Sequence, residues 1–197
     1  KVFAEGKRKK LKLEVNVSEL SVALDELNEL VGMDNVKTEI DELVRLIKYY
    51  NDIGKDVLNK FSLHTVFTGN PGTGKTTVAR ILGKIYKALG ILERGHTVEV
   101  DRETLVAGFI GQTAIKTQQK IEEALGGVLF IDEAYALADS GSTNDFGKEA
   151  IEVILKRMED LRGQFVVFAA GYTDNMNTFL TSNPGLNSRF DKKLHFE

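Results

Sequence analysis

The residues that decide the fold read Gly69-Asn70-Pro71-Gly72-Thr73-Gly74-Lys75-Thr76, and they stand between a short apolar run and a long helical pattern. They fit G-x-x-x-x-G-K-[ST], the Walker A loop, in which glycines let successive backbone N–H groups surround phosphate oxygens at the positive end of a helix. Lys75 is expected to reach the β- and γ-phosphates, and the Thr76 hydroxyl to ligate Mg²⁺. A glycine turn that binds nothing is the alternative, which the strand-loop-helix setting disfavours.

Outward from this loop, short β-branched runs alternate with longer helical patterns. Strands are expected at residues 63–68, 97–100, 128–131, 165–170 and 193–196, and helices at residues 20–30, 36–50, 74–89, 113–125 and 146–161. Two of the strands, 128–131 and 165–170, are apolar throughout, as strands buried on both faces are. The sequence therefore predicts an α/β fold: a five-stranded, mostly parallel sheet with helices on both faces.

The beginning of the chain differs in character from the rest. Residues 1–18 are expected to form a charged arm, and residues 19–197 one α/β domain. Within the arm, residues 11–15 alternate apolar and charged side chains, which leaves an extra edge strand and an irregular segment equally open. The run Ser140-Gly141-Ser142-Thr143-Asn144 predicts a mobile loop.

Composition excludes several classes of protein. The chain has 197 residues, of which 42% are hydrophobic and 28% charged, as in ordinary soluble domains. It has no cysteine, which excludes disulfides and iron-sulfur clusters and is typical of a cytoplasmic protein, and its three scattered histidines make a zinc centre unpromising. No run approaches the roughly 18 apolar residues that span a bilayer, so no membrane partner is expected.

The charge of the chain disfavours nucleic acid as a partner. The formal net charge is −3, but six of the basic side chains lie in the first twelve residues. The remaining 185 residues carry 20 basic and 28 acidic side chains. Proteins that bind nucleic-acid phosphates usually present a basic face instead.

A second pair of candidate residues follows the apolar run 128–131. Asp132 and Glu133 would lie at the carboxyl edge of the sheet, where open α/β sheets bind ligands. Asp132 is expected to hold the Mg²⁺ shell, and Glu133 to polarise a water for attack on the γ-phosphate. The alternative is that both carboxylates are merely solvated at the end of a strand. The Walker A loop earlier in the chain disfavours this alternative. A water-activating carboxylate favours hydrolysis over transfer to a bound acceptor.

Further stretches, together with these two motifs, resemble the AAA+ ATPases. They are Leu30-Val31-Gly32-Met33 and Asn183-Pro184-Gly185-Leu186-Asn187-Ser188-Arg189-Phe190. Within that family, five stretches are similar to the branch that contains stage V sporulation protein K and red-type Rubisco activase. They are the Walker A loop with its continuation Thr77-Val78-Ala79-Arg80, and Gly111-Gln112-Thr113-Ala114, Phe130-Ile131-Asp132-Glu133-Ala134-Tyr135, Phe146-Gly147-Lys148-Glu149-Ala150 and Ala170-Gly171-Tyr172. The resemblance extends from about residue 27 to residue 197.

The resemblance implies roles for individual residues. Val31 and Gly32 would contact adenine, and the nucleotide phosphates would be contacted by Asn70, Pro71, Gly72, Thr73, Gly74, Lys75, Thr76 and Thr77. Arg189 would be an arginine finger that reaches the γ-phosphate of a neighbouring subunit; a surface charge after a Pro-Gly turn is the alternative. Tyr172 occupies the place where many AAA+ proteins have a sensor asparagine. Phe109, Ile110 and Gly111 fall at the loop that grips substrate in a central pore; burial in an ordinary turn is the alternative.

The resemblance also implies a larger assembly. AAA+ proteins carry a helical lid after the α/β part, which is not expected within these 197 residues. With its lid, the protein is expected to form a hexamer that uses ATP and Mg²⁺ to remodel a protein client, releasing ADP. A nucleic-acid motor, or a nucleotide-gated switch with little turnover, are the two other functions that these motifs permit.

Overall fold

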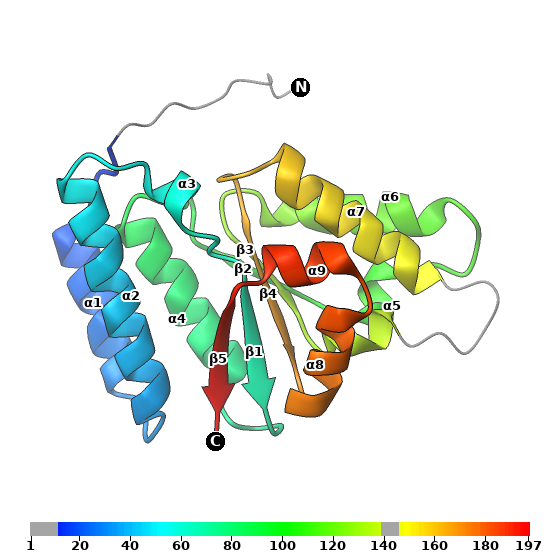
Figure 1. Ribbon diagram of the computed structural model, residues 1–197, viewed down its shortest axis with the longest axis horizontal. Coiled ribbons are helices and arrows are strands. Elements are labelled where there is room, and N and C mark those ends of the chain that lie inside the picture. Colours follow the sequence, from blue (N-terminus) through cyan, green and yellow to red (C-terminus); the bar gives the residue numbers. More distant parts are fainter. Residues whose placement is uncertain (1–11, 139–145) are drawn as a thin grey trace.

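A single parallel sheet organises the computed structural model, which describes residues 12–138 and 146–197 (Figure 1). Its strand order is β2-β3-β4-β1-β5, and all four neighbouring pairs are parallel. The strands are β1 (Thr65–Gly69), β2 (Thr97–Val100), β3 (Val128–Ile131), β4 (Val166–Gly171) and β5 (Lys192–Phe196). This confirms the predicted α/β class with a five-stranded sheet.

Helices cover both faces of the sheet (Figure 1). One face is covered by α1 (Val17–Asn28), α2 (Asp34–Asp52) and α4 (Lys75–Ala88). The other is covered by α5 (Arg102–Leu105), α6 (Gln112–Ala124), α7 (Phe146–Asp160), α8 (Thr173–Thr181) and α9 (Pro184–Arg189). Two shorter elements are α3 (Val57–Lys60), before β1, and the 3₁₀ helix η1 (Ala134–Leu137), after β3. Among the described residues, no helix combines the length and hydropathy needed to cross a bilayer.

The two-residue period of the strands divides the core into two layers. On the α4 side, the ring of Phe67 stacks on Phe168 and Phe196, with centroid distances of 5.0 and 5.5 Å. On the α7 side, buried aliphatic side chains such as Leu129 and Val167 fill the other layer. Each layer buries its own helices, so the position of a residue along a strand decides which helices it contacts.

Several predicted boundaries shift in the structure. The first helix begins at Val17, within the expected arm, because the Asn16 side chain accepts a hydrogen bond from the Glu19 amide and caps it there. The sequence leaves open whether residues 11–15 form an edge strand, and residues 12–15 do not form one. Instead the Leu13 amide donates to the buried side chain of Asn51, and the Leu13 carbonyl accepts from it. The helices α3, α5, η1, α8 and α9 were not predicted. Residue 11 and the expected mobile loop at residues 140–144 lie outside the described residues.

Candidate nucleotide-binding site

The Walker A loop joins β1 to α4 through backbone that only glycine accepts easily. Gly69, Gly72 and Gly74 have φ angles of 147°, 73° and 91°. A Cβ atom at Gly69 would lie 2.3 Å from the carbonyl oxygen of Phe196, so β5 packs directly on the start of the loop. Gly74 is the N-cap of α4 and provides no side chain to cap it. The first amides of α4 therefore have no side-chain cap, which is the setting that binds phosphate.

Lys75, the first residue of α4, folds its ammonium group over the loop. Its Nζ donates to the carbonyl oxygens of Gly69 at 3.0 Å and of Asn70 at 2.5 Å. Partial burial lowers the pKa of Lys75, and the negative charge of Asp132 opposes that shift. These acceptors of Lys75 are neutral. Phosphate oxygens can take their place, because they form stronger, charge-assisted hydrogen bonds with the ammonium group.

The two carboxylates after β3 lie beside this lysine. The Asp132 amide donates to the Val100 carbonyl at 2.8 Å, which extends the β2–β3 ladder by one residue and fixes the Asp132 backbone. Its side chain accepts from the Glu133 amide at 3.0 Å. Glu133 has a φ of 48°, in the left-handed region that glutamate rarely occupies. At this left-handed residue the chain leaves β3 and enters η1.

Tyr172 directly follows β4 at the same edge of the sheet and is the N-cap residue of α8. It is 40% exposed, and its ring lies 6.4 Å from the ring of Tyr135, on η1. Burial, and then the charge of Glu133, raise the pKa of Tyr135. The sequence does not predict Tyr135 as a neighbour of the site; the available signal is its place three residues after Asp132.

These residues surround one cavity of about 400 Å³. Its lining combines the glycine loop, the start of α4, both carboxylates and the end of β4: Gly69, Pro71, Gly72, Gly74, Lys75, Thr76, Thr77, Asp132, Glu133, Gly171 and Tyr172. The predicted Asn70 and Thr73 lie in the loop but outside this lining, and the Thr73 hydroxyl donates to the Asn70 carbonyl at 2.7 Å.

The segment expected to contact adenine lies next to the loop. Val31 is 94% exposed, and Gly32 has a φ of 73°. Neither lines the cavity, but the following residue, Met33, places its Cε 3.0 Å from where a Cβ of Gly74 would stand. Residues 31–33 therefore border the phosphate loop, and Met33 is a contact that the sequence did not predict.

The donor set of this cavity fits a magnesium nucleotide. Thr76 and Asp132 offer oxygen ligands beside Lys75. Within residues 12–138 and 146–197, no three His, Cys, Asp or Glu side chains cluster as a metal cage would need. Mg²⁺ is usually bound in this way, by one or two protein oxygens plus substrate phosphates.

Arg189 is far from this cavity. It ends α9, just before β5, and its carbonyl oxygen accepts a hydrogen bond from Ser62 at 2.7 Å, just before β1. Because β5 and β1 are parallel, Arg189 lies at the amino edge of the sheet and the Walker A loop at the carboxyl edge. The guanidinium therefore cannot serve the nucleotide of its own chain.

The loop predicted to grip substrate is exposed at its tip and held at its base. Phe109 is 70% exposed and Ile110 87%, so the alternative of a buried turn is wrong. At the base, the Ala107 amide donates to the Thr113 hydroxyl at 2.9 Å, and the Thr117 hydroxyl donates to the Leu105 carbonyl at 3.0 Å. Gly111 has a φ of 78° and precedes α6, so it ends the loop without strain.

A parallel sheet whose first strand leads through a glycine loop into a helix, with an Asp-Glu pair at the end of β3, one strand removed from β1, defines a P-loop nucleoside triphosphatase. The family model described as "ATPase family associated with various cellular activities (AAA)" matches residues 65–197. The chain belongs to this AAA family, whose members are ATPases.

Similar proteins come from bacteria and algae. Stage V sporulation protein K of Bacillus subtilis is 47% identical over 173 residues, which cover 87% of this chain and 53% of that protein. A chloroplastic ribulose bisphosphate carboxylase/oxygenase activase of Cyanidioschyzon merolae is 45% identical over 94% of this chain and 64% of its own length. Protein CbxX (plasmid) of Cupriavidus necator is 46% identical over 91% and 57%. The chain thus spans between about half and two thirds of these relatives.

Proposed function

We propose that this chain is the ATP-binding and hydrolysing part of a ring-forming AAA+ protein that remodels a protein client. The observation that supports this best is the single cavity of about 400 Å³ that Lys75, Thr76, Asp132 and Glu133 share. A site that only bound nucleotide would not need Glu133 held beside it in a strained backbone conformation.

The chemistry divides among these side chains. Lys75 exchanges its loop carbonyls for β- and γ-phosphate oxygens, while Thr76 and Asp132 hold Mg²⁺, which neutralises charge on the phosphates when bound. Glu133 orients the attacking water and accepts its proton. Tyr172 lines the cavity and is the sensor candidate.

Arg189 supports a ring because it lies at the far edge of the sheet. An arginine there can act only on the nucleotide of a neighbouring subunit, and each subunit then provides one finger and one base. Such a finger stabilises the transition-state charge and is typically worth 10³ to 10⁵ in rate. We propose a hexamer for the longer protein that carries the lid.

The exposed Phe109 and Ile110 support a protein client. Burying each such side chain contributes roughly 1.5 to 3 kcal/mol, so leaving both in water is costly unless a partner covers them. Aromatic and aliphatic contacts hold many sequences without specific hydrogen bonds, which suits a client threaded as an extended chain. The names of the relatives include a carboxylase activase, so an enzyme complex is one client class to test.

Two substitutions in the cavity test the ATPase. Lys75→Ala should abolish ATP binding, because no neighbouring cation replaces its charge. Glu133→Gln should bind Mg²⁺-ATP normally by calorimetry but lose phosphate release, because the amide keeps the shape and cannot accept the proton. Normal phosphate release by Glu133→Gln would contradict the assignment of the base; normal ATP binding by Lys75→Ala would contradict the site itself.

A further inference from the structure

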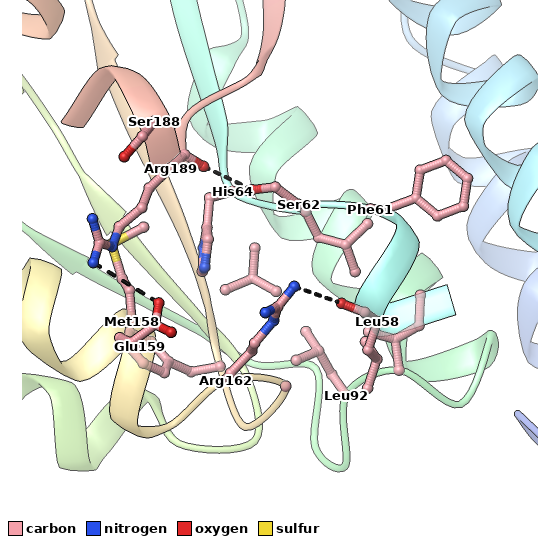
Figure 2. A pocket seen from close by; sticks show the side chains of 15 residues that line it. Leu58, Phe61, Ser62, His64, Leu92, Met158, Glu159, Arg162, Ser188 and Arg189 are labelled. Atoms are coloured by element: carbon pink, nitrogen blue, oxygen red, sulfur yellow. Dashed lines mark hydrogen bonds and ion pairs between the residues drawn. The ribbon is translucent and has the colours of Figure 1, made fainter. Parts of the chain in front are cut away.

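A second hollow, of about 360 Å³, lies at the amino edge of the sheet, opposite the Walker A loop (Figure 2). It is bounded by the segment before β1, the segment after α4, the end of α7 with the residues that follow it, and the end of α9. Its volume falls in the range of small-molecule sites. It shares no lining residue with the nucleotide cavity.

Two arginines line this hollow, and neither has a strong partner among residues 12–138 and 146–197. Arg162 makes one long bond, 3.4 Å, to the Leu58 carbonyl. Arg189 lies 3.8 Å from the carboxylate of Glu159 and 3.3 Å from the Gly185 carbonyl, and its buried Nε has no hydrogen-bond partner among the described residues. A guanidinium group normally binds a carboxylate or phosphate through two short parallel hydrogen bonds. Both arginines therefore have hydrogen-bond donors left for an anion.

His64 supplies a third donor. Its Nδ1 accepts a hydrogen bond from the Val167 amide at 2.9 Å, which leaves the proton of the neutral ring on Nε2. Figure 2 shows the ring directed into the hollow between Arg189 and Arg162. Burial, then Arg189 and Arg162, lower the pKa of His64 to about 4, so the ring is neutral at pH 7.

The remaining wall of the hollow is apolar. Leu92, Met158 and Phe165 are buried side chains that line it, and Glu159 is the one acidic side chain among the lining residues. The hollow thus offers two positive charges against one negative charge, next to an apolar surface.

We propose that this hollow binds a small organic anion. Its carboxylate or phosphate group pairs with Arg162 and Arg189 and accepts from His64 Nε2, and its apolar part packs on Leu92 and Met158. This binding is independent of nucleotide. Its consequence rests on the proposed function: the anion occupies the guanidinium that the finger needs, so it slows ATP hydrolysis in the assembled ring.

The first experiment uses the imidazole NMR signals of the chain, which has three histidines. Benzoate should shift the His64 signal saturably, with a Kd of about 1 mM. Inorganic phosphate should do so more weakly, and benzyl alcohol, which has no charge, should not. The bound anion screens both guanidinium groups, so benzoate should also raise the pKa of His64, and affinity should increase as the pH falls. His64→Asn identifies the signal.

Matched variants separate this site from general charge effects. Arg162→Gln should weaken benzoate binding about tenfold, and Glu159→Gln should strengthen it by removing the competing carboxylate. Lys156→Gln removes the same charge from α7 outside the hollow and should change nothing. The proposal is overturned if neither benzoate nor phosphate shifts His64 saturably, or if Lys156→Gln weakens binding as much as Arg162→Gln. These measurements use no ATP, so they stand or fall separately from the ATPase assays.

Discussion

Glu133, the proposed base, has a backbone conformation that disfavours a residue with a side chain. Its φ and ψ of 48° and 47° place it in the left-handed region, where a residue with a Cβ carries a cost of roughly 1–2 kcal/mol. The turn is made because the chain must leave β3 sharply, and the neighbouring Ala134 and Leu137 are buried beneath it. A residue chosen for stability alone at this position would be glycine.

Two variants at this position test the strain. Glu133→Gly and Glu133→Ala both remove the carboxylate, so both should lose ATP hydrolysis. The Gly variant should be about 1 kcal/mol more stable than the Ala variant in urea unfolding, because only glycine adopts the turn freely. Equal stability of the two would mean that the turn relaxes in solution and that the backbone stores no strain there.

His64 makes stability depend on pH. Its pKa is about 4 in the folded chain against 6.5 for an unperturbed histidine, so the unfolded chain takes up the proton first as the pH falls. This contribution is complete above about pH 6.5 and is lost as the pH falls to about 4, with a total of about 3 kcal/mol.

His64→Asn is the matched variant, since its Oδ1 can accept the Val167 amide at the place of Nδ1 and does not titrate. Urea unfolding between pH 7 and 4 should show a smaller loss of stability in the variant than in the parent. Carboxylates contribute equally to both proteins, so parallel curves would contradict the low pKa of His64.

At the scale of elements, the loop between α5 and α6 has an exposed tip on a fixed base. Phe109→Ala should change the free energy of unfolding by no more than about 0.5 kcal/mol, because the ring is exposed. In the full-length protein it should leave basal ATP hydrolysis within about a factor of three, under roughly 0.7 kcal/mol, while client remodelling is lost.

Leu105→Ala is the control for that loop, since Leu105 is buried at the base and its truncation should cost about 2 to 5 kcal/mol. A stability loss of that size in Phe109→Ala would assign Phe109 to packing. Retained remodelling would remove it from the client contact.

The sequence predicts the strands and the long helices, but not the helices of 9 residues or fewer. The strands and the five long helices follow from apolar periodicity, and the Walker A loop from its glycines. The helix α5 has only four residues, and its signal was the Asp101–Thr104 capping box. Asn183 before Pro184 gave a similar signal for α9. The hollow around His64 has no local signal, because residues from four segments that are distant in the sequence form it.

At the scale of the whole molecule, β1 separates the two halves of the proposed chemistry. β1 has 5 residues and is therefore about 16 Å long. Arg189 lies beside its amino end and the Walker A loop at its carboxyl end. In the proposed function, one chain therefore presents a base on one edge and a finger on the other. Head-to-tail contact between copies would bring the two together, and such contacts form a ring where the rotation between copies closes.

This arrangement predicts complementation between two inactive variants of the full-length protein. Arg189→Ala should bind ATP about normally and hydrolyse it very slowly, because it retains its base but offers no finger to its neighbour. Glu133→Gln retains its finger and lacks the base. In a mixture that exchanges subunits, some Arg189→Ala sites meet an intact finger from Glu133→Gln, so phosphate release should exceed that of either variant alone. Mixing Arg189→Ala with the double variant Glu133→Gln/Arg189→Ala is the control, since no finger is then present. A mixture as inactive as its components, with exchange verified by fluorescence, would exclude a finger that acts between subunits.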